Sequence, residues 1–153
     1  MNTRRHSTSL GFSLIELLIV VAVIGLVSAI AIPNVITAIQ RARQTRSMAD
    51  LKTLARALSL YNQDYIDYPI ETSPASAENL RPFLHPYMGD FETTDGWRRP
   101  FMYTSDGRKY TLISYALGGV ANLPYTIGPI HQLEEDIVMS DGVFVQWPEG
   151  VQH

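Results

Sequence analysis

One carboxylate stands inside the longest apolar stretch of this sequence. Glu16 follows the residues Gly11-Phe12-Ser13-Leu14-Ile15 and precedes an almost unbroken apolar run from Ile19 to Ile32, which ends at Pro33. An ionised side chain in such a segment is costly to place in lipid, and it is usually functional and paired with an opposite charge. The sequence therefore marks Glu16 as a functional residue that needs a cationic partner.

Other residue types that commonly carry chemistry are absent or dispersed. Cysteine does not occur, which excludes disulfides, thiolate zinc sites and a cysteine nucleophile. The sequence contains no nucleophile elbow and no phosphate-binding glycine loop, and its histidines lack the spacing of metal ligands. We therefore expect a chain that is not an enzyme. The histidines, which we expect at the surface, are His6, His85, His131 and His153.

Two clusters allow more than one interpretation. The acidic residues Glu134, Glu135 and Asp136 could supply oxygen ligands to calcium, or they could form a solvated acidic loop. The pair Arg98-Arg99 beside Trp97 could form an ion pair with an acidic neighbour. A third set, the aromatic residues of the C-terminal half, could form a binding platform but is more typical of the core of a small sheet. Besides Trp97 this set contains Phe101, Tyr103, Tyr110, Tyr115, Phe144 and Trp147.

The element that positions Glu16 has the length of a membrane helix. The 21 residues from Phe12 to Ile32 would span about 30 Å, which is the hydrocarbon thickness of a bilayer. We predict a transmembrane helix over residues 12–33, with weak points at Gly25 and Pro33 because proline lacks the backbone donor. Residues 1–11 are polar and basic, as in a leader peptide.

The charges flanking this helix give conflicting signals about its orientation. Arg4 and Arg5 favour a cytoplasmic N-terminus, whereas Arg41, Arg43 and Arg46 follow the span and outnumber them. We expect a cytoplasmic N-terminus, because residues 1–11 have the composition of a leader peptide. An exported soluble binding module or enzyme that begins with an ordinary, cleaved signal peptide is an alternative, because residues 29–31 read Ala-Ile-Ala, which resembles a cleavage site. Against it stand Glu16 and the helical pattern that continues beyond Pro33.

The pattern after Pro33 predicts an amphipathic helix over residues 34–67. Apolar residues recur there at spacings of three and four, which indicates one face covering a core. The dipeptide Tyr68-Pro69 is expected to end the helix. The members of this stripe are Leu51, Leu54, Leu58, Tyr61 and Tyr65.

Residues 68–153 form a small domain in this interpretation. We expect a loop over residues 70–95 with a short helix near residues 77–84, then two hairpins. These hairpins join residues 100–104 to 110–115 and residues 135–139 to 143–147, with a surface loop at 118–132 between them. The fold class is α+β: a long N-terminal helix packed on a small antiparallel β-sheet. Residues 67–153 hold twelve acids and five basic residues, so we expect no nucleic-acid partner.

At Gly11-Phe12-Ser13-Leu14-Ile15-Glu16 the sequence resembles the processing site of type IV pilin-like proteins, and Gly25 and Pro33 also match that family. Its later motifs are similar, in the same order, to those of the major pseudopilin of the type II secretion system. These motifs are Asp95-Gly96-Trp97, Pro100-Phe101, Tyr110-Thr111-Leu112, Ser114-Tyr115 and Asp136-Ile137.

The resemblance implies a filament subunit. A prepilin peptidase would cut after Gly11 and methylate the new amine of Phe12, and Glu16 would pair with the Phe12 amine of a neighbouring copy. The helix would loosen between Gly25 and Pro33 in the filament. Implied partners are copies of the chain, an inner-membrane assembly platform with its ATPase, and minor pseudopilins. The chain would cross the inner membrane once, with its C-terminal domain in the periplasm. A type IV pilin or a competence pseudopilin is the alternative.

Two positions depart from the major pseudopilin pattern. Arg98 follows Trp97, where the family has a small residue. The family's calcium loop contains an aspartate that is missing from the run Ser114–Gly119 of this chain, although Asp136 matches the later acidic position. The resemblance therefore implies calcium as a cofactor with an incomplete set of matching ligands.

Overall fold

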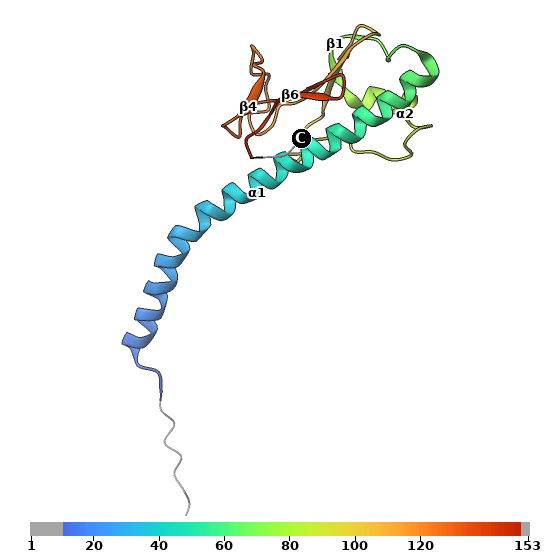
Figure 1. Ribbon diagram of the computed structural model, residues 1–153. Coiled ribbons are helices and arrows are strands. Elements are labelled where there is room, and N and C mark those ends of the chain that lie inside the picture. The colour runs from blue at the N-terminus through green and yellow to red at the C-terminus, as the bar shows by residue number, and fades with distance from the viewer. Residues whose placement is uncertain (1–10, 151–153) are drawn as a thin grey trace, which may run out of the picture. The chain divides into compact units, whose positions relative to one another are not determined.

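The computed structural model describes residues 11–150, and it consists of one long helix followed by a six-stranded sheet (Figure 1). Helix α1 (Leu14–Tyr65) occupies the first part of the described chain. The chain divides after Ala38 into two compact units, and α1 contributes to both. Each unit is described below by itself.

In the first unit, α1 is helical from Leu14, two residues later than the predicted start at Phe12. The helix continues through Gly25 and Pro33 without interruption. Proline removes one intrahelical donor. In the same turns the side chain of Asn34 donates to the carbonyl of Ile30 at 3.2 Å, and the Thr37 hydroxyl donates to the carbonyl of Pro33 at 3.0 Å. Polar side chains thus give two carbonyls around Pro33 an additional donor.

In the second unit, the predicted apolar stripe of α1 is the inner face of the helix. Leu51, Leu54 and Leu58 have no exposed surface and belong to the hydrophobic core. Burying a leucine side chain contributes about 1.5–3 kcal/mol, so these three positions anchor the domain to the helix. The stripe weakens toward its end, because Tyr61 is only partly buried and Tyr65 is 61% exposed.

Helix α1 ends at Tyr65, before the expected stop at Tyr68-Pro69. The next residue, Ile66, has a positive φ of 69°, which a β-branched residue rarely adopts. Its amide donates to the carbonyl of Asn62 at 2.8 Å, and the Asn62 side chain donates back to the carbonyl of Ile66. The two hydrogen bonds of Asn62 therefore end the helix at Tyr65, three residues before Tyr68, where the following proline was expected to end it.

The sheet contains both predicted hairpins. β2 (Met102–Ser105) and β3 (Tyr110–Ser114) are antiparallel, with Ser105 opposite Tyr110. β5 (Ile137–Ser140) and β6 (Val143–Pro148) are also antiparallel, with Ser140 opposite Val143. β3 and β5 pair with each other, which joins the two hairpins into one sheet. Of the predicted aromatic set, Phe101, Tyr103, Tyr110 and Phe144 are buried in the core, whereas Trp97, Tyr115 and Trp147 are only partly buried.

Two strands lie where loops were expected. β1 (Glu71–Ser76) pairs with β2, and β4 (Gly128–Ile130) pairs with β6 in parallel, so the strand order is β1-β2-β3-β5-β6-β4. The expectation of loops over residues 70–95 and 118–132 was therefore wrong at these points, and the sheet is mixed rather than purely antiparallel. Both strands occupy sheet edges and contain a proline, which an edge strand tolerates because part of its backbone is not paired. Their sequences lack the alternation that signals a strand.

The short helix predicted near residues 77–84 is present as two consecutive turns. The 3₁₀ turn η1 (Ala77–Leu80) is followed directly by α2 (Arg81–Leu84). The Ser76 hydroxyl accepts the amide of Glu78 at 3.2 Å and caps the first turn. Leu80 and Leu84 are buried, so this segment adds to the core that α1 and the sheet share.

Candidate functional site

Glu16 lies in the first turn of α1, where it already has a partner in its own chain. Its Oε2 accepts the backbone amide of Ser13 at 2.9 Å. Ser13 precedes the first helical residue, so the pair has the Ser-x-x-Glu spacing of a capping box. The carboxylate thus satisfies one free amide at the helix start. A backbone amide carries no formal charge, and among residues 11–150 no cation forms an ion pair with Glu16.

The helix around Glu16 is apolar and exposed. No residue in its most apolar part is buried. By length and composition it could cross a membrane. Phe12, just before the helix, is 85% exposed. Exposed apolar surface of this extent is typical of a site that contacts a membrane or another chain.

The other predicted site residues of this unit are placed as follows. Gly11 and Phe12 precede α1 in an exposed stretch without regular structure, and a Cβ at Gly11 would meet no atom within 4 Å. Gly25 and Pro33 lie farther along the helix, within its exposed part. Gly11, Phe12 and Glu16 are thus close in sequence around the helix start. The predicted leader, with Arg4 and Arg5, lies outside the described residues except for Gly11.

A second set of contacts fixes the turn Asp95-Gly96-Trp97 on α1. The amide of Gly96 donates to the Ser47 hydroxyl at 2.9 Å, and the Trp97 indole donates to Gln40 Oε1 at 2.7 Å. A Cβ at Gly96 would lie 2.6 Å from the carbonyl oxygen of Arg43, so only glycine fits. Sequence reasoning missed Ser47, although its position four residues before Leu51 places a polar residue in the apolar stripe.

Asp95 is a buried carboxylate whose importance was not predicted. Its Oδ1 accepts the amides of Trp97 and Arg99, each at 2.9 Å, and its Oδ2 accepts the Ser114 hydroxyl at 3.0 Å. Only 4% of its surface is exposed. Asp95 therefore joins the turn to the end of β3, and its oxygens are engaged by donors rather than directed at a ligand.

The acidic cluster does not converge on a cation. Glu135 Oε2 accepts the amides of His131 and Gln132 at 2.9 and 3.1 Å, while Asp136 Oδ2 accepts the amide of Asn122 at 2.8 Å. Glu134 is exposed. Among residues 11–150 no group of three or more His, Asp or Glu side chains could hold a metal ion. Calcium takes six to eight oxygen ligands, so the residues of this cluster do not fit calcium.

Asp136 is nevertheless unusual because it has no exposed surface. Burial raises the pKa of this carboxyl above its ordinary value, and the hydrogen bond from the Asn122 amide offsets only part of that effect. Its second oxygen, Oδ1, is buried without a hydrogen-bond partner. Asp136 is thus a structural residue of the loop that it ends.

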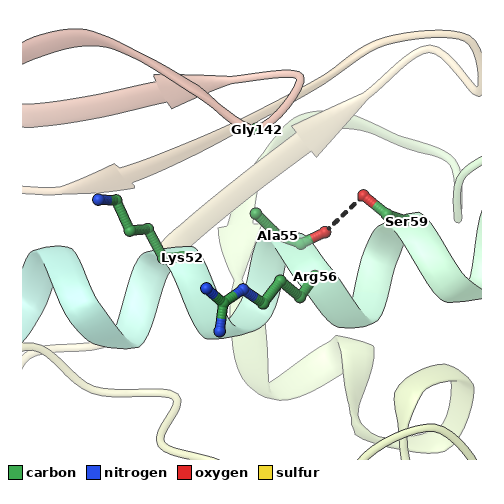
Figure 2. A pocket seen from close by; sticks show the side chains of 5 residues that line it. All are labelled: Lys52, Ala55, Arg56, Ser59 and Gly142. Carbon is green, nitrogen blue, oxygen red and sulfur yellow. Dashed lines mark hydrogen bonds between the residues drawn. The ribbon is translucent and has the colours of Figure 1, made fainter. Parts of the chain in front are cut away.

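A shallow groove lies between α1 and the turn joining β5 to β6 (Figure 2). Its volume is about 310 Å³. The Ser59 hydroxyl donates to the carbonyl of Ala55 at 3.0 Å, and no acid or histidine lines the groove to activate it. Two cations face this space, so it could receive an anionic group, but it lacks a catalytic constellation. The lining residues are Lys52, Ala55, Arg56, Ser59 and Gly142.

Comparison with known protein families gives two adjacent matches. Residues 7–32 match the prokaryotic N-terminal methylation motif, which includes Gly11, Phe12 and Glu16. Residues 34–123 match the family described as type II secretion system (T2SS), protein G. The second match includes the turn Asp95-Gly96-Trp97 and ends within the loop between β3 and β5.

Individual relatives agree with these matches. The chain is 29% identical to the type II secretion system core protein G of Pseudomonas aeruginosa, over 77% of this chain and 87% of that protein. It is 27% identical to the core protein G of Aeromonas hydrophila, over 84% and 94% of the two chains. With the core protein G of Vibrio cholerae the identity is 28%, over 71% and 79%. No solved structure matches the chain.

Proposed function

This chain belongs to the type II secretion system protein G family, the major pseudopilins, and we propose that it polymerises through its N-terminal helix into a pseudopilus. Members of this family are structural proteins rather than enzymes. The observation that carries the proposal is the exposure of the apolar part of α1 beside a match to the methylation motif. The apolar surface of such a helix is covered by lipid before assembly and by the helices of other subunits after assembly.

The N-terminus is prepared for assembly by processing. A prepilin peptidase cleaves after Gly11 and methylates the new amine of Phe12. The exposed stretch without regular structure before Leu14 supports this step, because a peptidase needs an extended and accessible backbone. The cut precedes α1, so the whole apolar helix is retained in the mature subunit.

Glu16 then pairs with the Phe12 amine of a neighbouring copy. One carboxylate oxygen caps its own helix through the Ser13 amide, and the other is available for a cation. Surrounded by apolar side chains, an ammonium–carboxylate pair is strengthened by the low dielectric, whereas an unpaired carboxylate is costly. The pairing therefore fixes the axial register between subunits.

The remaining parts of the chain follow from this arrangement. Residues 1–11 form the leader, residues 12–33 cross the inner membrane once, residues 34–67 continue as an amphipathic helix, and residues 68–153 form the periplasmic domain. Within the filament the helix loosens between Gly25 and Pro33, where intrahelical bonding is weakest. An inner-membrane platform with its ATPase and minor pseudopilins assemble the filament, which drives exported proteins outward.

Two substitutions of Glu16 test the pairing. Glu16→Val removes both the charge and the cap, whereas Glu16→Gln keeps an oxygen for the Ser13 amide and removes only the charge. If the charge pairs with a neighbour, both variants are processed and inserted, and both lower the yield of sheared filaments at least about tenfold, equivalent to about 1.4 kcal/mol. Normal filament yield from Glu16→Gln would show that the side chain serves only as a helix cap.

A further inference from the structure

The loop between β3 and β5, residues 115–136, is fixed by side chains of the chain itself. The family's calcium loop lies in this region, but the acidic residues here do not converge on a cation. Instead, three carbonyl oxygens that could have served as ligands accept hydrogen bonds from nitrogen. These oxygens belong to Ala116, Glu134 and Asp136.

The first fixed point is Arg99. Its guanidinium Nη1 donates to the carbonyl of Ala116, which is completely buried. The guanidinium also lies against Gly119, where a Cβ would be 2.5 Å from the guanidinium carbon. Gly119 has a φ of +73°, so the absence of a side chain serves both the backbone conformation and the approach of the arginine.

Arg99 is itself held in place by the turn that precedes it. Its amide donates to Asp95 Oδ1 at 2.9 Å, and Asp95 Oδ2 accepts the Ser114 hydroxyl at 3.0 Å. The Ser114 hydroxyl in turn accepts the amide of Ala116 at 3.2 Å. Asp95 thus binds both the backbone of Arg99 and, through Ser114, the beginning of the loop. These bonds hold Arg99 next to the loop.

Asn122 and Gln146 fix the rest of the loop. Asn122 donates its amide to Asp136 Oδ2 and its side-chain nitrogen to the carbonyl of Glu134, each at 2.8 Å. Gln146, on β6, donates to the carbonyl of Asp136 at 2.9 Å and accepts the amide of Thr126 at 3.1 Å. The loop is therefore tied to itself and to the sheet at separate points.

From these contacts we propose that Arg99 has the structural role that a bound cation would otherwise have, so that the folded domain is independent of calcium. A guanidinium provides several donors in a fixed plane and carries a permanent positive charge. It satisfies the Ala116 carbonyl, and its charge disfavours a divalent cation beside it. The arginine pair noted in the sequence acts here through Arg99 on a backbone carbonyl, not through an ion pair with an acid.

The test uses the full-length chain in detergent. Its melting temperature is followed by the fluorescence of Trp97 and Trp147 with added calcium and with a chelator. We expect the same melting temperature in both conditions. A higher melting temperature with calcium would overturn the proposal.

Limited chymotrypsin digestion then tests Arg99 directly, because Leu117 and Tyr125 offer cleavage sites in the loop. In Arg99→Met we expect roughly tenfold faster cleavage there, because one charge-assisted hydrogen bond no longer opposes local opening. Arg98→Met is the matched control, since Arg98 is exposed. Chymotrypsin should cleave the loop of this variant at the wild-type rate. Equal rates for the two variants would refute the role of Arg99. If Arg99→Met does not fold, Arg99→Lys, which keeps the charge but loses the planar donors, is compared in the same way.

Discussion

The two parts of helix α1 differ in apolar content and in surroundings. Between residues 14 and 38 nearly every side chain is exposed, including Ile19, Ile24 and Ile32. Between residues 44 and 58, by contrast, Leu51 and Leu54 have no exposed surface. The second part buries its apolar face in the hydrophobic core, whereas the apolar side chains of the first part are exposed within the described residues.

This difference shows that the role of each part can be inferred from whether its apolar side chains are buried or exposed. The second part stabilises the domain, because its side chains leave water when the chain folds. The side chains of the first part stay exposed in the described residues, so they do not stabilise the domain in this way. Changes in the two parts should therefore have separable effects, one on domain stability and the other on insertion and assembly.

The largest expected effect on stability comes from the core. Leu54→Ala should lower the free energy of unfolding by about 2–5 kcal/mol, through lost burial and the cavity left behind. Ile24→Ala, in the exposed part, should leave it unchanged. The measurement is denaturant unfolding of the full-length chain in detergent, followed by tryptophan fluorescence. Equal destabilisation by the two variants would contradict the separate roles of the two parts of α1.

A smaller effect is expected where a hydroxyl links the helix to the domain. Ser47 is buried, accepts the Gly96 amide and donates to the carbonyl of Arg43. Ser47→Ala leaves the Gly96 amide without its acceptor and should cost about 1–3 kcal/mol. Thr37→Val is the control, because the Thr37 hydroxyl bonds only within the exposed part of the helix, to Pro33. The same unfolding experiment compares them, and a loss in Thr37→Val as large as in Ser47→Ala would argue against the assignment.

The smallest effect is a pH dependence. Burial raises the pKa of Asp136 above 3.8, so the folded domain holds this proton more tightly than the unfolded chain does. Ionisation therefore opposes folding, and the wild type should gain stability relative to Asp136→Asn as pH falls through the raised pKa toward 3.8. Unfolding series at several pH values measure both proteins, and parallel curves for wild type and Asp136→Asn would contradict the burial argument.

Sequence patterns predicted the elements whose signals are local. The helical stripe from Leu51 to Leu58 and the two hairpins follow from periodicity and turn residues, and all are present. The family resemblance, carried by Gly11 to Glu16 and later motifs, agrees with the matched families.

The parts that were missed depend on contacts distant in sequence. β1 and β4 are edge strands, with prolines at 74 and 129, and pairing rather than composition makes them strands. The roles of Asp95 and Ser47 depend on bonds to residues 19 and 49 positions away, respectively. An ion pair with an acid was one possibility for the pair Arg98-Arg99, but Arg99 donates to the carbonyl of Ala116, which the loop brings close. Periodicity carries no information about such contacts.

The central claim is that the exposed apolar part of α1 is retained in the mature protein as its membrane and assembly element. The most direct test is the intact mass of the mature protein isolated from membranes. We predict a chain that begins with N-methylated Phe12 and keeps the whole of α1. A chain that begins at Ile32, after cleavage at Ala29-Ile30-Ala31, would contradict the account, because it would lack Glu16 and most of the exposed helix.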